Sequence, residues 1–163
     1  MTKTKRTLSG KGKREKGKRF ERAWAAVLRE WFPQYADEIH RSIQSRGPEA
    51  CDVIGLPGYW FECQDAVTPT PIAKLVQAER DLALSDDTDR TPIAITHRTG
   101  SRSTQATLRT GDLLHLFADL RLHNPVGKLR HHLRGRLPIA VSSLPITLDA
   151  EDLLMMIRHA NGW

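Results

Sequence analysis

A β-hairpin is predicted at residues 52–64, where Pro57-Gly58 separates two short segments of strand-forming residues. The first segment reads Asp-Val-Ile-Gly-Leu and the second reads Tyr-Trp-Phe-Glu-Cys-Gln. β-Branched and aromatic residues favour strands, and Pro-Gly favours a tight turn. We therefore expect a central sheet, with helices supplied by the flanking sequence.

Apolar residues at helical spacing predict helices on both sides of this hairpin. A first helix ends at Pro33, and its apolar residues are Phe20, Trp24, Val27, Leu28 and Trp31. A second helix runs to about Ser85, with Thr70 as N-cap and Pro71 at its first position. Its apolar residues are Ile72, Leu75, Val76 and Leu82.

The remaining segments complete an alternation of helices and strands. We predict one strand and a turn within 36–46, strands at 92–97 and 104–110, and a strand through 138–144. Further helices are predicted at 112–122 and from Asp149 to about His159. The predicted fold class is α/β, with a mixed central sheet flanked by helices.

The length of 163 residues fits one globular domain. No apolar run approaches the roughly 18 residues of a membrane span, and no apolar stretch follows the basic N-terminus, so we expect an intracellular protein without a membrane partner. Cys51 and Cys63 lack the spacing of a zinc site and are predicted to be small buried residues. We divide the chain into 1–19, 20–122 and 123–163.

Positive charge is concentrated in two segments of the chain, whose formal net charge is +6. Residues 1–19 hold one acid, Glu15, and nine basic residues: Lys3, Lys5, Arg6, Lys11, Lys13, Arg14, Lys16, Lys18 and Arg19. We interpret them as a flexible arm that contacts nucleic acid, although a solvated tail has the same composition. The second segment, 121–136, has five Arg or Lys, three His and no acid, and it opens the C-terminal extension, which ends in a helix.

Carboxylates of the hairpin are the candidate chemical groups. Side chains alternate along a strand, so Glu62 and Gln64 share one face while Phe61 and Cys63 share the other. Asp52 opens the opposite arm, within reach of Glu62. Two carboxylates and the main-chain carbonyl of Cys63 are the oxygen ligands that Mg²⁺ prefers. The spacing alone equally fits an edge-strand charge or a turn residue.

Several of these residues resemble the PD-(D/E)xK nucleases, and within that superfamily the archaeal and phage-type Holliday junction resolvases. The resemblance covers about residues 16–120 and also includes Gln77-Ala78 and the helix after Asp112. Its motifs are Gly17-Lys18-Arg19-Phe20-Glu21-Arg22, Arg41-Ser42 before Gly47-Pro48, Asp52-Val53-Ile54-Gly55 and Glu62-Cys63-Gln64.

The resemblance implies a restriction-endonuclease-like αβββαβ core in a metal-dependent DNA endonuclease. Asp52 and Glu62 would bind Mg²⁺, with Mn²⁺ as a substitute, and Glu21 would complete or support the site. It also implies branched DNA as substrate, a homodimer that makes two symmetric cuts, and the cytoplasm, or the host cytoplasm for a phage gene. The expected DNA contacts are Lys11, Lys13, Arg14, Lys16, Lys18, Arg19, Arg41 and Ser42.

Gln64 departs from the motif, which usually has Lys at this place. A neutral amide can orient the attacking water but supplies no positive charge. We hypothesise that Lys74, in the next helix, replaces the missing cation; the alternative is that Lys74 faces solvent. Two other functions stay open: a nuclease-like DNA-binding protein with impaired catalysis, and a restriction or repair nuclease that acts on linear duplex.

Overall fold

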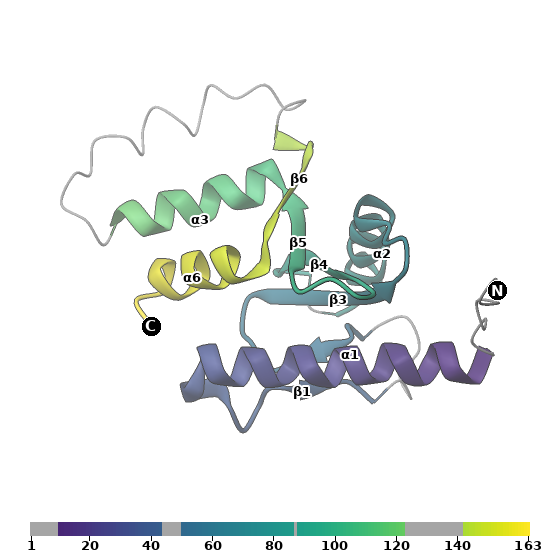
Figure 1. Cartoon of the computed structure of the whole chain (residues 1–163). Helices are drawn as coiled ribbons and strands as arrows, with labels where there is room; N and C mark the ends of the chain where they lie inside the picture. Colours follow the sequence, from purple (N-terminus) through teal and green to yellow (C-terminus); the bar gives the residue numbers. More distant parts are fainter. Residues whose placement is uncertain (1–9, 44–49, 87, 123–141) are drawn as a thin grey trace.

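A mixed six-stranded sheet forms the centre of the protein (Figure 1). The computed structural model describes residues 10–43, 50–86, 88–122 and 142–163. The strands lie in the order β1-β2-β3-β4-β5-β6; β3 and β4 are parallel and the other neighbours are antiparallel. Their bounds are β1 His40–Arg41, β2 Val53–Ile54, β3 Tyr59–Ala66, β4 Thr91–Arg98, β5 Thr104–Arg109 and β6 Pro145–Asp149. The predicted α/β class is confirmed.

Helices cover both faces of this sheet. They are α1 Gly10–Trp31, the short 3-10 helix η1 Pro33–Tyr35, α2 Pro71–Ala83, α3 Thr110–Leu122 and α6 Ala150–Ala160. Helix α2 connects β3 to β4, because two parallel neighbours need a crossover. Figure 1 shows α1 along one face and α2 on the opposite side, while α3 and α6 pack together beside β5 and β6. The element order up to β4 is αβββαβ.

The predicted hairpin is present, and its alternation decides what each face of β3 contacts. Val53 pairs with Phe61 across the two antiparallel strands. Phe61 and Cys63 enter the larger apolar core with Trp24 of α1, whereas Trp60 packs on the opposite side against residues of α2. Glu62 therefore lies opposite Phe61, as the alternation predicted, and on that face it meets α2.

A close backbone contact fixes the end of β2. Gly55 has a φ of 101°, a conformation that glycine adopts without strain. A Cβ at this position would lie 2.1 Å from the main-chain oxygen of Glu38. Only glycine therefore lets the segment after β2 pass the segment before β1.

The flexible arm predicted at residues 1–19 is wrong for residues 10–19, which form the first half of α1. Residues 1–9 lie outside the described part of the chain. Lys and Arg are good helix formers, and a buried contact holds this half of the helix to the sheet. Lys16 Nζ lies 3.0 Å from Asp65 Oδ1 at the end of β3 and also hydrogen-bonds the Thr99 hydroxyl. The first turns of α1 then extend past β3 (Figure 1).

The Lys16–Asp65 contact gives a pH-dependent contribution to stability. Burial alone would raise the pKa of Asp65, but hydrogen bonds from Lys16, His97 and Thr99 lower it below 3.8. A depressed carboxyl pKa stabilises the fold above the unfolded-state pKa, and this stability is lost as the pH falls through the folded-state value. Urea unfolding of Asp65→Asn at pH 7 and pH 3 should show a pH dependence flatter by about 1 kcal/mol. An unchanged dependence would contradict this role.

Two details of the second predicted helix differ from expectation. Thr70 precedes α2, and Pro71 is at its first position, but the Thr70 side chain does not cap the helix. Ile72 and Val76 are exposed, whereas Leu75, Ala78 and Leu82 form its buried face. The apolar spacing of this helix was compatible with two faces, and the packing on β3 and β4 selects one of them.

The C-terminal elements differ from the prediction in one strand. The strand expected through 138–144 lies mostly outside the described residues, and the described strand is β6, Pro145–Asp149, paired with β5. Asp149 then caps α6, because its side chain accepts a hydrogen bond from Glu151 N. Trp163 packs edge-on against Phe32 and Tyr35 and so closes one end of the core.

Candidate functional site

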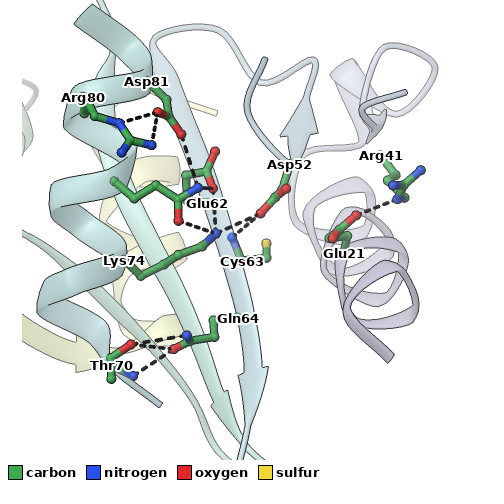
Figure 2. A network of polar contacts seen from close by, with 11 residues as sticks. Glu21, Arg41, Asp52, Glu62, Cys63, Gln64, Thr70, Lys74, Arg80 and Asp81 are labelled. Carbon is green, nitrogen blue, oxygen red and sulfur yellow. Dashed lines mark hydrogen bonds and ion pairs between the residues drawn. The ribbon is translucent and has the colours of Figure 1, made fainter. Parts of the chain in front are cut away.

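Glu62 lies in the middle of β3 and is only 3% exposed. Its Oε2 accepts a hydrogen bond of 2.8 Å from Lys74 Nζ on α2. The same ammonium lies 3.5 Å from Asp52 Oδ2 (Figure 2). Lys74 therefore bridges the two carboxylates that the sequence pattern indicates. The Lys74 side chain is 13% exposed, so the alternative that it faces solvent is wrong.

Asp52 directly precedes β2 and is held in place by β3. Its Oδ2 accepts a hydrogen bond of 2.8 Å from the main-chain N–H of Cys63, and its own N–H donates to the Phe61 oxygen. The N–H and C=O of one strand residue point to the same side of the strand. The Cys63 carbonyl therefore lies on the edge of β3 that faces Asp52.

The site has more negative than positive charge. Burial, together with the neighbouring Asp52 carboxylate, raises the pKa of Glu62 to about 7, because Lys74 compensates only in part. Burial alone would lower the pKa of Lys74, but Glu62 and Asp52 outweigh it and raise that pKa. Burial is the larger cause of the Glu62 shift, and the sharing of one ammonium group by two carboxylates contributes to both shifts. A further cation would allow both carboxylates to ionise.

Glu21 is buried in α1 but is paired with a different residue. Its Oε2 accepts a hydrogen bond of 2.6 Å from Arg41 Nε of β1. Burial raises the pKa of Glu21, and the nearby Asp52 raises it further. Across the residues that the structure describes, no group of three or more His, Cys, Asp or Glu side chains is placed to hold a metal ion. Glu21 is thus near enough to Asp52 to be affected by its charge, while the Glu21 carboxylate accepts a hydrogen bond from Arg41.

Gln64 does not turn toward the two carboxylates. Its Oε1 accepts a hydrogen bond of 2.8 Å from the main-chain N–H of Thr70, and its Nε2 lies 3.3 Å from the Thr70 hydroxyl. Figure 2 shows the amide pointing away from β3 to Thr70, at the start of α2. Gln64 therefore anchors the start of α2, in place of the cap expected from Thr70.

Some of the residues expected to contact nucleic acid are exposed, and the others contact residues of the protein itself. Lys16 and Arg41 form the ion pairs described above. Ser42 is buried, and its main-chain N–H donates to the main-chain oxygen of Asp52. Lys18 is half-exposed and lies 3.4 Å from Glu15. The exposed residues of the set are Lys11, Lys13, Arg14 and Arg19. The basic segment at 121–136 lies almost entirely outside the described residues.

Two residues near the site, Gln77 and Asp81, were given no role from the sequence, although Gln77 belongs to the resemblance. Gln77 Nε2 lies 3.4 Å from Glu62 Oε2 and 3.2 Å from Asp81 Oδ2. Asp81 is 4% exposed although it is charged. Their signal in the sequence was their spacing: Gln77 follows Lys74 by three residues and Asp81 follows Gln77 by four, which places all three on one side of a helix.

No protein-family model, curated protein or solved structure matches this chain. Within the described ranges, none of the helices is both long and apolar enough to cross a bilayer. The functional inference therefore depends on the site itself.

Proposed function

We propose that the protein is a metal-dependent DNA endonuclease with a PD-(D/E)xK-type site on a restriction-endonuclease-like core. The observation that carries this proposal is the bridge from Lys74 Nζ to Glu62 and Asp52, which groups two carboxylates with one buried ammonium. Phosphodiester hydrolysis needs these components: acidic ligands for a cation and a fixed positive charge for the transition state. We propose branched DNA, such as a Holliday junction, as the favoured substrate.

The residues present fit a Mg²⁺ ion. Asp52, Glu62 and the Cys63 carbonyl offer hard oxygen ligands, and the two carboxylates outnumber the one ammonium between them. Mn²⁺ prefers the same oxygen ligands and would serve as a substitute. A bound Mg²⁺ would supply a Lewis acid and lower the pKa of a coordinated water.

The chain's own residues take separate roles in this proposal. Lys74 is the only cation in contact with both carboxylates among the described residues, and it would stabilise the charge that develops on the phosphate. Arg41 holds the Glu21 carboxylate at the border of the site. Hydrolysis would leave a 5′-phosphate and a 3′-hydroxyl, as the resemblance to the PD-(D/E)xK nucleases implies.

A basic row on α1 is the proposed DNA contact. Lys11, Arg14, Lys18 and Arg22 follow one another at intervals of three or four residues, so they lie on one side of the helix. They span about 16 Å, the length of about five phosphates of one strand. Cations near a helix N-terminus are unfavourable, so bound phosphates would also stabilise this end of α1.

The salt dependence of DNA binding tests the basic row. The double variant Lys11→Gln/Arg14→Gln should reduce the slope of log affinity against log salt by about 0.9 for each phosphate that is no longer neutralised, hence by about 1.8. Fluorescence anisotropy of labelled DNA in EDTA measures this slope without cleavage. Arg158→Gln, on α6, is the control and should leave the slope unchanged. Equal slopes in all three proteins would contradict the assignment of α1.

Cleavage of a synthetic four-way junction tests the function itself. The junction and a linear duplex of matched sequence are incubated with Mg²⁺, Mn²⁺ or EDTA, using wild type and Glu62→Gln. We expect two symmetric, metal-dependent cuts in the junction, absent in the variant. Equal cutting of both substrates would instead identify a nuclease of linear duplex. Two symmetric cuts require a twofold-symmetric homodimer, which the mass of the complex in solution would show.

A second candidate is a DNA-binding protein of the same fold that no longer cuts. The observation that favours it is Gln64, which stands where the nuclease motif usually has Lys and is engaged with Thr70. This candidate predicts salt-sensitive junction binding without product in any divalent metal. Metal-dependent cleavage that is abolished in Glu62→Gln would eliminate it.

A further inference from the structure

Helix α2 directs a connected row of polar side chains at Glu62. Lys74, Gln77 and Asp81 share the side of the helix that faces β3, and none of the three is exposed. Lys74 Nζ has three protons and three acceptors within reach: Glu62 at 2.8 Å, Gln77 Oε1 at 3.3 Å and Asp52 at 3.5 Å. Gln77 is thus the one neutral partner of this ammonium among the described residues.

The amide of Gln77 has one favourable orientation. Its Oε1 accepts from Lys74, while its Nε2 faces the carboxylate oxygens of Glu62 and Asp81 at 3.4 Å and 3.2 Å. The flipped amide would place its oxygen against two carboxylates and its nitrogen against an ammonium. The surrounding charges therefore fix which end of the amide contacts Lys74.

Asp81 holds the Gln77 amide through a hydrogen bond. Its Oδ1 accepts two hydrogen bonds from Arg80, at 2.8 Å from Nη2 and 3.0 Å from Nε, and its Oδ2 is left for Gln77. The hydrogen bonds run from Arg80 through Asp81 and Gln77 to Glu62, and Figure 2 shows Arg80, Asp81 and Glu62 along this path. The Asp81 carboxylate is too deeply buried to turn into solvent, so its contacts with both Arg80 and Gln77 are fixed.

We propose that Gln77 is a positioning residue that holds the Lys74 ammonium between Glu62 and Asp52, an inference that rests on the proposed endonuclease function. A lysine on a helix reaches the strand through a long, flexible side chain. Such a side chain needs a further contact to keep one conformation. Gln77 supplies this contact, whereas the strand position that the motif reserves for lysine is occupied by Gln64.

Chemical labelling of Lys74 tests the positioning without metal, DNA or turnover. The variant Gln77→Met keeps the volume of the side chain and removes all three hydrogen bonds, and Gln64→Met is the matched control on the same strand–helix pair. Acylation of Lys74 by an amine-reactive ester, followed by mass spectrometry, should be about 5-fold faster in Gln77→Met than in wild type. The control loses the Thr70 contact but keeps every hydrogen bond of Lys74, so it should change the Lys74 labelling rate much less than Gln77→Met does.

A second variant separates the contact from the packing. Gln77→Glu keeps an acceptor for Lys74, so Lys74 labelling should remain slow even though its new carboxylate faces those of Glu62 and Asp81. In the cleavage assay Gln77→Met should lower kcat about 10-fold with KM unchanged, because the position of Lys74 matters most in the transition state.

The outcomes are distinguishable. Labelling and kcat in Gln77→Met equal to those in Gln64→Met would overturn the positioning role. Faster labelling of Lys74 in a protein whose wild type cuts no DNA would keep the positioning role and reject the endonuclease function.

Discussion

Cleavage of a four-way junction is expected to fall by about 10²- to 10³-fold when Lys74 is replaced by methionine, because the variant lacks one fixed positive charge at the transition state. Methionine retains the length of the buried stem, and the variant should remain folded. The measurement is the single-turnover cleavage rate with saturating Mg²⁺, with the circular dichroism spectrum as a check on folding.

The matched controls are Lys18→Met and Gln64→Met. Lys18 is a half-exposed lysine of α1, so its removal should weaken DNA binding without changing the single-turnover rate. Gln64 contacts Thr70, so its removal should lower stability more than the rate. Full activity in Lys74→Met together with inactivity in Gln64→Met would show that the strand amide, and not the helix lysine, serves the chemistry.

Gly55→Ala is expected to destabilise the protein by about 3 to 5 kcal/mol, the range of the most damaging single substitutions. An added Cβ would lie 2.1 Å from the Glu38 oxygen, and the φ of 101° is unfavourable for any L side chain. This corresponds to a fall in Tm of roughly 10 °C or more for a chain of this length.

Gly58→Ala separates backbone strain from steric overlap. Gly58 also has a positive φ, of 80°, but a Cβ there would meet nothing within 4 Å. We therefore expect Gly58→Ala to cost only about 1 kcal/mol. Thermal unfolding of both variants gives the comparison, and equal decreases in stability would contradict the role of the Glu38 contact.

Local pattern was sufficient to predict the hairpin and the face of Glu62. Strand alternation is a property of the backbone, so the assignment of Glu62 to the side opposite Phe61 did not depend on the rest of the fold. The start of α2 at Pro71 could also be predicted from local sequence, since a helix tolerates proline only in its first turn.

Residues that depend on long-range contacts could not be predicted in the same way. The first half of α1 is held to the sheet by the contact of Lys16 with Asp65, which is 49 positions away. The position of Gln64 on the strand was predicted correctly, but its amide oxygen accepts a hydrogen bond from the Thr70 N–H at the start of α2. The exposure of Ile72 and Val76 follows from how α2 packs on the sheet, which no local pattern contains.

The order of β2, β3 and α2 along the chain has a consequence for folding. Asp52, Glu62, Lys74, Gln77 and Asp81 lie within one contiguous stretch, so bringing them together closes only short loops. The pairing of β5 with β6 joins residues 40 positions apart, such as Thr107 and Thr147. The entropic cost of closing a loop grows with its length. The candidate site should therefore form early in folding. Pulsed hydrogen exchange during refolding should then protect the amides of β3 before those of β6.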